Sequence, residues 1–355
     1  MTQRKIVIVF TGTVASTLAP KIINTFKKDD YKVSAVFTER AKYFLSKGEM
    51  FSLQMSTPVY SDTSEWHGES YHKDQKIPHI ELAKENDLLL IIASADYMAK
   101  MANGFCDDLA SSLYRAWDRT KPVFLCPAMN TQMWEHPVTK TQLVTLNFWG
   151  VNVIFPIVKK LACGDEGMGA LEDISKIKER IDKQFENVFP LSNFNGIPVK
   201  NHQGAFLAKR KYAPHTGVDL YTSNGEYVQA MNDGVVVSIE DFTGKGDNSP
   251  WWNDTKCVLI KHWFGVVCYG EIDVGLLFEG EKVTKGQTIG TVKQVLKKGK
   301  ERPDIAGHSL SMLHIELYPE NVKRASKSYE QDKDILLDPT DILKRACGGN
   351  VKLLE

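Results

Sequence analysis

The sequence predicts an α/β protein in which a doubly wound parallel sheet is followed by a second, all-β domain. In the first half, apolar runs such as 6–10 and 88–93 alternate with helical patterns, which is typical of βαβ units. In the second half, short β-rich runs, among them 234–239 and 258–262, are separated by Gly, Asp and Asn turns. The length of 355 residues also favours two domains over one.

Composition and charge narrow the class of protein. The 44 basic and 44 acidic residues cancel, so no global field favours nucleic acid or an anionic membrane as a partner. The apolar run 6–10 is too short for a signal peptide, and no stretch approaches the ~18 apolar residues of a membrane span. The six cysteines form no CxxC pair, which favours reduced thiols. We therefore expect a cytoplasmic protein that binds neither nucleic acid nor membrane.

The first elements of the chain predict an anion site. A strand at 6–10 leads through the turn 11–16 into an amphipathic helix that carries Leu18, Ile22 and Phe26. Free amides and the helix dipole converge at such a helix start, where a phosphate can bind. On the motif alone, a tight turn without a ligand is favoured by about two to one.

The next stretch predicts further strands and one long loop. Run 33–37 reads as a strand that ends at Thr38, whose hydroxyl caps a short helix. From 50 to 75 no clear periodicity is present, which indicates a long loop over the site. Strand 88–93 precedes a helical run from 99 to 117.

The segment 127–137, Pro-Ala-Met-Asn-Thr-Gln-Met-Trp-Glu-His-Pro, is the centre of the predicted site. It follows the buried strand 123–126, which Pro127 ends. Open α/β sheets bind ligands beyond the carboxyl ends of their strands, so Asn130 is placed as a binding residue. A helix at 137–148 and a strand at 151–155 follow. The glycines of 161–169 then predict a mobile flap.

The segment from His79 to Ala170, with its PAMNxxMW and ACGD elements, resembles phosphopantothenoylcysteine decarboxylases of the eukaryotic type. The resemblance extends from the first strand to about Ile177. It implies a Rossmann-like flavoprotein that uses FMN to convert 4'-phosphopantothenoylcysteine into 4'-phosphopantetheine in coenzyme A biosynthesis. It also implies a homotrimer that holds FMN between subunits.

The resemblance assigns residues to this site. It implies that His79 and Cys163 are catalytic. Without the resemblance, a structural role would be expected for both: a helix cap or packing residue for His79, and a small buried hydrophobic residue for Cys163. The substrate is expected at Asn130, Met133, Ala162 and Gly164, and FMN at Gly12, Thr13, Thr38, Phe44, Ser94, Ala95, Asp96, Tyr97 and Ala128. Asp96 and Tyr97 depart from the Asn and Thr of the family. Because Asp lacks the two amide donors of Asn, we expect altered flavin binding.

The second half contains four ordered landmarks at 215–219, 233–236, 286–290 and 313–316. In this order they resemble lysostaphin-like M23 zinc peptidases of the LytM fold, over roughly 214–318. The expected division is a decarboxylase domain at 1–190, a linker or crossing strand at 191–213, the β domain at 214–320 and a C-terminal extension at 321–355.

By this resemblance His215, Asp219 and His314 form a three-ligand zinc set with one open position. Active members carry two further histidines, where this sequence has Glu271 and Met312. Methionine cannot transfer a proton, so we expect a peptidase-like module without peptidase activity. Whether it binds zinc stays open.

Two other functions compete with the decarboxylase. The first is a flavin-binding regulatory protein without turnover, and the second is a peptidyl-cysteine decarboxylase whose β domain holds the peptide. The presence of His79, Asn130 and Cys163 together argues against a pure binder, which has no need of all three.

Overall fold

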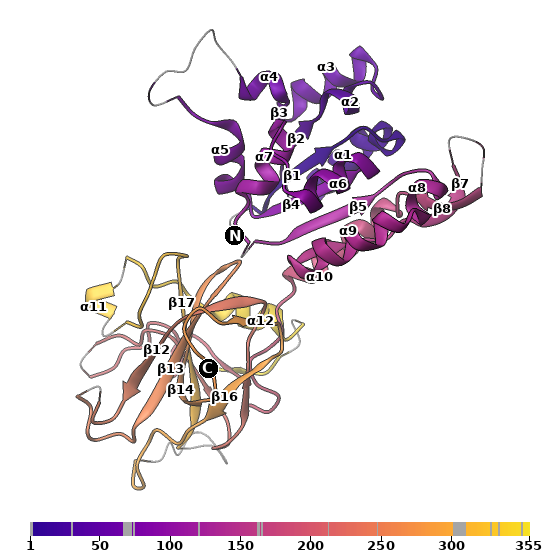
Figure 1. Cartoon of the computed structure of the whole chain (residues 1–355). Helices are drawn as coiled ribbons and strands as arrows, with labels where there is room; N and C mark the ends of the chain where they lie inside the picture. The colour runs from indigo at the N-terminus through magenta and orange to yellow at the C-terminus, as the bar shows by residue number, and fades with distance from the viewer. Residues whose placement is uncertain are drawn as a thin grey trace. The chain divides into compact units, whose positions relative to one another are not determined.

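The computed structural model describes residues 3–29, 31–66, 73, 75–119, 121–161, 164, 166–211, 213–246, 248–300, 310–326, 329–332, 334–348 and 351–355. The chain divides into two compact units, Met1–Gln184 and Phe185–Glu355 (Figure 1). The first is a helix-covered parallel sheet and the second is an antiparallel, β-rich unit. The predicted fold class is confirmed.

The first unit contains a six-stranded sheet in which every pairing is parallel. The strand order is β3-β2-β1-β4-β5-β6, so the direction of winding reverses between β1 and β4. Ligands bind at such a switch point in doubly wound sheets. The strands are β1 Lys5–Phe10, β2 Lys32–Phe37, β3 Val59–Tyr60, β4 Leu88–Ala93, β5 Val123–Pro127 and β6 Val151–Val153.

Helices cover both faces of this sheet. Val7 and Val9 of β1 pack in one cluster with residues of α5, α6, α7 and α9. Ile6 and Ile8, which point to the opposite face, are also fully buried. The helices are η1 Val14–Leu18, α1 Ala19–Lys28, α2 Glu39–Lys42, α3 Lys47–Ser56, α4 Asp62–Glu65, α5 Pro78–Glu85, α6 Ala95–Asn103, α7 Leu109–Ala116, α8 Thr131–Glu135, α9 Pro137–Phe148 and α10 Ile174–Phe185.

Two expectations about local structure were wrong. The segment expected to be a long loop contains most of α3, together with β3 and α4. A capping box between Ser46 and Glu49 starts α3, and the weak apolar pattern of this helix hid it from periodicity. The single helical run expected at 99–117 is two helices, because Gly104 adopts the left-handed conformation (φ +71°) that ends α6.

A two-stranded antiparallel ribbon, β7 Ile157–Lys160 and β8 Glu166–Ala170, occupies the segment expected to be a flap. Its glycines serve close packing. A Cβ on Gly169 would lie 2.2 Å from the carbonyl oxygen of Met129, and one on Gly167 would lie 2.3 Å from Thr131 Oγ1. The Met129 N–H also donates to the Gly169 carbonyl (2.9 Å), which holds the ribbon against the loop after β5.

The second unit is built on an eight-stranded sheet with the path β10-β17-β14-β13-β12-β15. Strand β16 pairs with both β11 and β14, and all these pairings are antiparallel. The strands are β10 Val218–Tyr221, β11 Tyr227–Gln229, β12 Gly234–Thr243, β13 Thr255–His262, β14 Gly265–Val274, β15 Lys282–Val283, β16 Thr288–Val292 and β17 Met312–Tyr318. Two short helices, α11 Tyr329–Asp332 and α12 Thr340–Ala346, follow.

The segments on either side of this sheet belong to its core. Leu191, Ile197 and Val199 are buried in the same cluster as Leu343 of α12. Strand β9 (Ile197–Pro198) pairs with β18 (Leu353–Leu354) near the C-terminus. The boundaries drawn at 191–213 and 321–355 stay predictions. No helix in the described ranges is both long and apolar enough to cross a membrane.

Candidate functional site

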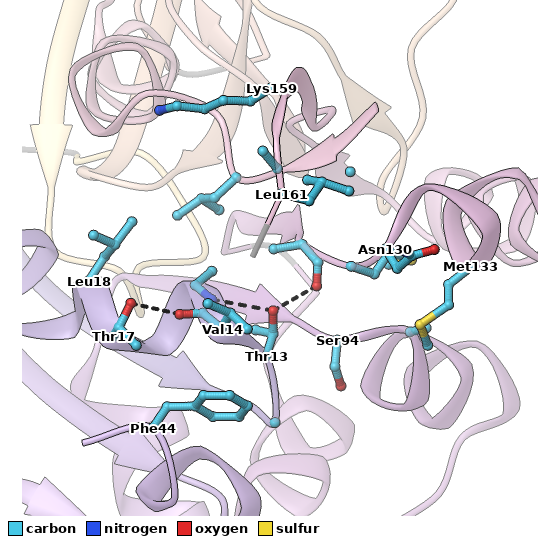
Figure 2. Close-up of a pocket in the computed structure, with 18 of the residues that line it drawn as sticks. Thr13, Val14, Thr17, Leu18, Phe44, Ser94, Asn130, Met133, Lys159 and Leu161 are labelled. Carbon is cyan, nitrogen blue, oxygen red and sulfur yellow. Dashed lines mark hydrogen bonds between the residues drawn. The ribbon is translucent and has the colours of Figure 1, made fainter. Parts of the chain in front are cut away.

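A cavity of about 440 Å³ lies beyond the carboxyl ends of β1, β4 and β5, at the switch point of the parallel sheet (Figure 2). Its size is in the usual range for small-molecule and cofactor sites. The ribbon β7–β8 supplies part of its wall. The lining residues are Gly12, Thr13, Val14, Ala15, Thr17, Leu18, Phe44, Ser94, Ala95, Ala128, Met129, Asn130, Met133, Lys159, Lys160, Leu161, Gly169, Ala170 and Leu171.

Buried hydroxyl groups join the three strand ends that form the floor. Thr11 Oγ1 donates to the Ile92 carbonyl (2.9 Å) and accepts from the Ser94 N–H (2.8 Å). Thr13 Oγ1 donates to the Ala128 carbonyl (2.8 Å), as Figure 2 shows. The turn after β1 is therefore fixed to the ends of β4 and β5, and the floor of the cavity is preorganised.

Asn130 caps the N-terminus of α8. Its Oδ1 accepts from the Gln132 N–H (2.8 Å), so the acceptor end of the amide is fixed by the helix. Asn130 and Met133 lie together at one end of the cavity (Figure 2). An amide held in this way can donate hydrogen bonds to a carboxylate without adding a charge.

The cavity brings together most of the residues expected around substrate and cofactor. Eight of them line it: Gly12, Thr13, Phe44, Ser94, Ala95, Ala128, Asn130 and Met133. Gly164 does not; it adopts φ +95° and donates to the Leu161 carbonyl (2.9 Å). Ala162 and Cys163 lie outside the described residues, so the roles expected for them stay predictions.

Three expected cofactor residues do not line the cavity. Thr38 caps α2 by accepting from the Ala41 N–H (3.2 Å). Asp96 is half exposed and faces Arg40 at 3.4 Å, while the ring of Tyr97 is buried in the core beneath α6. The hydroxyl of Tyr97 has no hydrogen-bond partner among the described residues. Asp96 and Tyr97, which replace the Asn and Thr of the family, therefore do not alter the described wall of the cavity.

His79, expected as a catalytic residue, also does not line the cavity. It lies at the start of α5, where its Nδ1 is hydrogen-bonded to Oε1 of Glu65. Its backbone N–H donates to Oε2 of the same carboxylate (3.2 Å). Glu65 is nearly buried, with a side chain 7% exposed, so this pair is a fixed feature of the unit.

Sequence reasoning missed about half of the cavity wall. Leu18 was assigned to the buried face of a helix, yet it is 38% exposed and lines the cavity. Lys159 and Lys160 were assigned no role, although they stand directly before Leu161 and therefore near the expected site. Their positive charge is the feature of the sequence that could have identified them as binding residues for an anionic ligand.

A second group of polar side chains lies in the β-rich unit. His215 Nε2, Asp219 Oδ1 and His314 Nδ1 are separated by 3.0, 2.8 and 3.2 Å, and all three residues are buried. The adjacent strands β10 and β17 place Asp219 directly opposite His314. His215 Nδ1 bonds to the Ala205 carbonyl (2.9 Å), so a neutral His215 directs the lone pair of Nε2 at the other two atoms. Three ligand atoms that converge in this way fit a divalent cation.

Further charges surround this cluster. Arg210 donates to Asp219 Oδ2 at 2.5 Å, and Glu316 Oε1 lies 3.3 Å from His314 Nε2. Burial alone would raise the pKa of Asp219, but His215 and Arg210 hold it well below its usual range. Burial alone would lower the pKa of His314, but Asp219 and Glu316 raise it to about 10. The polar groups of the cluster are therefore largely engaged with one another.

The structure also locates Glu271 and Met312. Glu271 is 8% exposed, adopts φ +63°, and its Oε2 has no partner among the described residues. Burial and the nearby Asp219 raise its pKa to about 8. Met312 is buried in an apolar cluster with Tyr221 and Val295, so no group able to transfer a proton is present at that position.

Comparison with known proteins adds relatives for both units. Residues 1–186 match the protein family described as Flavoprotein, and residues 213–325 match peptidase family M23. The phosphopantothenoylcysteine decarboxylase of Mus musculus is 36% identical over 179 residues, which cover 50% of this chain and 85% of that protein. The enzyme of the same name from Arabidopsis thaliana is 39% identical over 175 residues, covering 49% and 81%. A solved PPC decarboxylase mutant, complexed with pantothenoylaminoethenethiol, is 36% identical and covers 52% of this chain and 99% of its own, with a TM-score of 0.49.

Proposed function

Because this chain belongs to the flavoprotein family, we propose that its first unit is an FMN-dependent phosphopantothenoylcysteine decarboxylase of coenzyme A biosynthesis. It would release carbon dioxide from 4'-phosphopantothenoylcysteine and yield 4'-phosphopantetheine. The observation that carries this proposal is the cavity at the switch point, which places Asn130 and Met133 beside Gly12, Thr13 and Phe44. Relatives named for this activity are more than a third identical over most of their own length.

The cavity fits a flavin in its chemistry. Phe44, Leu18 and Leu171 offer apolar surface to a planar ring system, and the small residues Gly12 and Ala128 would let the ring lie close to the backbone. Bound there, FMN would supply the oxidation of the substrate thiol that makes loss of carbon dioxide feasible. The protein's own contribution is orientation: Asn130 donates to the substrate carboxylate, and the apolar wall excludes water.

The position of His79 supports assembly into the expected homotrimer. This residue does not reach the cavity of its own chain, so we propose that it serves the cavity of a second copy. The first unit also exposes large apolar side chains, including Tyr43 (87%), Phe51 (65%) and Phe148 (86%), that a subunit interface would cover. Sedimentation analysis of the full chain tests the assembly. Cytoplasmic localisation stays a prediction from the sequence.

The decisive experiment measures carbon dioxide release from 4'-phosphopantothenoylcysteine by the purified full chain, with its visible absorption spectrum recorded. Cys163→Ser is run in parallel. A yellow protein that decarboxylates supports the proposal, and a serine variant that releases carbon dioxide but stops before reduction supports the role of Cys163. A colourless or inert protein would refute the proposal.

For the second unit we propose a Zn²⁺ site made of His215, Asp219 and His314, in a module without peptidase activity. The convergence of the three ligand atoms within 3.2 Å supports the metal. The absence of a proton-transferring group at Met312 supports the lack of hydrolysis. Elemental analysis after dialysis against Zn²⁺ tests the site: about one ion per chain is expected, and His314→Ala should release it. A metal content unchanged by that substitution would contradict the assignment.

A further inference from the structure

The charged side chains that line the cavity of the first unit all have the same sign. Among the described residues that line it, two are cationic, Lys159 and Lys160, and none is acidic. The rest of the wall is apolar or carries neutral hydroxyl and amide groups. A cavity of this kind attracts an anionic ligand, and its low-dielectric walls strengthen the attraction.

Both lysines lie at the end of β7, on the ribbon rather than on the parallel sheet. In the register of the ribbon, Lys159 faces Gly167 and Lys160 faces Glu166. Neither lysine forms an ion pair with a described residue, and both are exposed. Their charges are therefore not neutralised within the described chain.

The cavity wall formed by the ribbon carries positive charge, whereas the wall formed by the strand ends is neutral. Figure 2 shows Lys159 and Leu161 on the opposite side of the cavity from Thr13 and Phe44. The residues proposed for FMN, such as Gly12, Thr13 and Ser94, belong to the strand-end wall. A phosphate on the cofactor would follow that wall, so the lysines face a different anion.

We propose that Lys159 and Lys160 bind the phosphate of the substrate and so select a phosphorylated small molecule over a peptide that ends in cysteine. This inference rests on the function proposed above. Asn130 would hold the carboxylate at one end of the substrate, and the ribbon would hold the phosphate at the other. Lysine suits this role because its ammonium is a compact charge that binds phosphate without fixed geometry.

The experiment compares kcat/KM for 4'-phosphopantothenoylcysteine and for pantothenoylcysteine, which lacks the phosphate. In the wild type, the phosphorylated substrate should be preferred by roughly 30-fold or more, as expected for charge-assisted hydrogen bonds to two lysines. In the double variant Lys159→Ala/Lys160→Ala, this preference should fall to about threefold or less, mainly through KM. Lys140→Ala, an exposed lysine of α9 away from the cavity, is the matched control and should keep the preference.

A second arm identifies the source of the anion. The dissociation constants of FMN and riboflavin are compared in the same proteins. A double variant that binds FMN more weakly but keeps its preference for the phosphorylated substrate would overturn the proposal, because the lysines would then hold the cofactor phosphate. A wild-type preference that survives the double substitution would also overturn it.

A third arm separates this inference from the proposed function. Binding of 4'-phosphopantothenate and pantothenate, neither of which can be decarboxylated, is measured by equilibrium dialysis. A protein without turnover that still binds the phosphorylated compound through the lysines would refute the decarboxylase and support the phosphate subsite. If the enzyme is active but the lysine substitutions change the binding of neither 4'-phosphopantothenate nor pantothenate, the phosphate subsite is refuted and the decarboxylase function is not.

Discussion

The cavity of the first unit and the polar cluster of the second differ in what their polar groups bind. In the cavity, Lys159 and Lys160 remain without ionic partners among the described residues. In the cluster, Asp219 alone contacts Arg210, His215 and His314, and its side chain is 4% exposed. The cavity keeps charged groups available for a small-molecule ligand, whereas the polar groups of the cluster contact one another across β10 and β17 and leave room at most for a metal ion that they would share. The second site therefore resembles a structural element more than a catalytic one.

The largest effect is expected from a substitution that disrupts the polar cluster of the second unit. Asp219→Ala should lower the free energy of unfolding of the second unit by about 3–5 kcal/mol, because it removes the buried carboxylate that pairs with His314 and Arg210. Hydrogen exchange of β13 and β14 in urea measures this. The control is Asp241→Ala, which breaks an exposed pair with Lys256 (2.9 Å) and should cost at most about 1 kcal/mol. Equal losses in the two variants would show that the cluster adds nothing beyond a surface pair.

The second prediction tests the role of Asn130 in the cavity of the first unit. Asn130→Asp keeps the cap on α8 but replaces the amide donors with a negative charge that repels the substrate carboxylate. We expect kcat/KM for decarboxylation to fall by about 10²–10³-fold. Steady-state kinetics measure this, with Asn147→Asp on the exposed end of α9 as the control. A change of less than threefold would remove Asn130 from the binding site.

The third prediction concerns a buried histidine outside the cluster. His262 accepts from the Tyr269 hydroxyl (2.9 Å) and donates to the Asp233 carbonyl (3.0 Å), and burial lowers its pKa to about 4. The unfolded chain binds a proton near pH 6.5 and the folded chain does not, so the stability of the second unit should fall between about pH 6.5 and 4, by roughly 3 kcal/mol.

Urea unfolding of wild type and His262→Gln across that pH range isolates this contribution. The variant should be less stable at neutral pH but should lose less of its stability on acidification. Parallel pH curves for the two proteins would assign the acid sensitivity to other groups.

The smallest effect is expected at Asp96. The pair with Arg40 is solvent-exposed at 3.4 Å, and neither residue lines the cavity. Asp96→Asn should change the free energy of unfolding by less than about 1 kcal/mol and leave the affinity for FMN unchanged. Flavin titration followed by fluorescence tests this. A marked change in affinity would show that Asp96 reaches the cofactor in the assembled protein.

Much of the first site could be predicted because strand ends are visible in the sequence. The apolar run of β5 indicated where the chain leaves the sheet and so placed Asn130, and the family resemblance added Thr13 and Ser94 to the same crevice. The direction of a side chain after a strand end could not be predicted. Asp96 and Tyr97 follow Ala95 directly, yet one turns to solvent and the other into the core, because α6 begins there and successive helical residues point about 100° apart.

The sequence alone determined the two-unit architecture, because it depends on local patterns, whereas the His-Asp-His cluster was predicted from the family resemblance of its ordered landmarks. Only the tertiary structure decided three other features: the wall formed by Lys159 and Lys160, the pairing of His79 with Glu65, and the burial of Glu271 in a left-handed conformation. Each depends on segments that meet through strand pairing or packing. Such contacts follow from the registers of the whole fold, which no local pattern encodes.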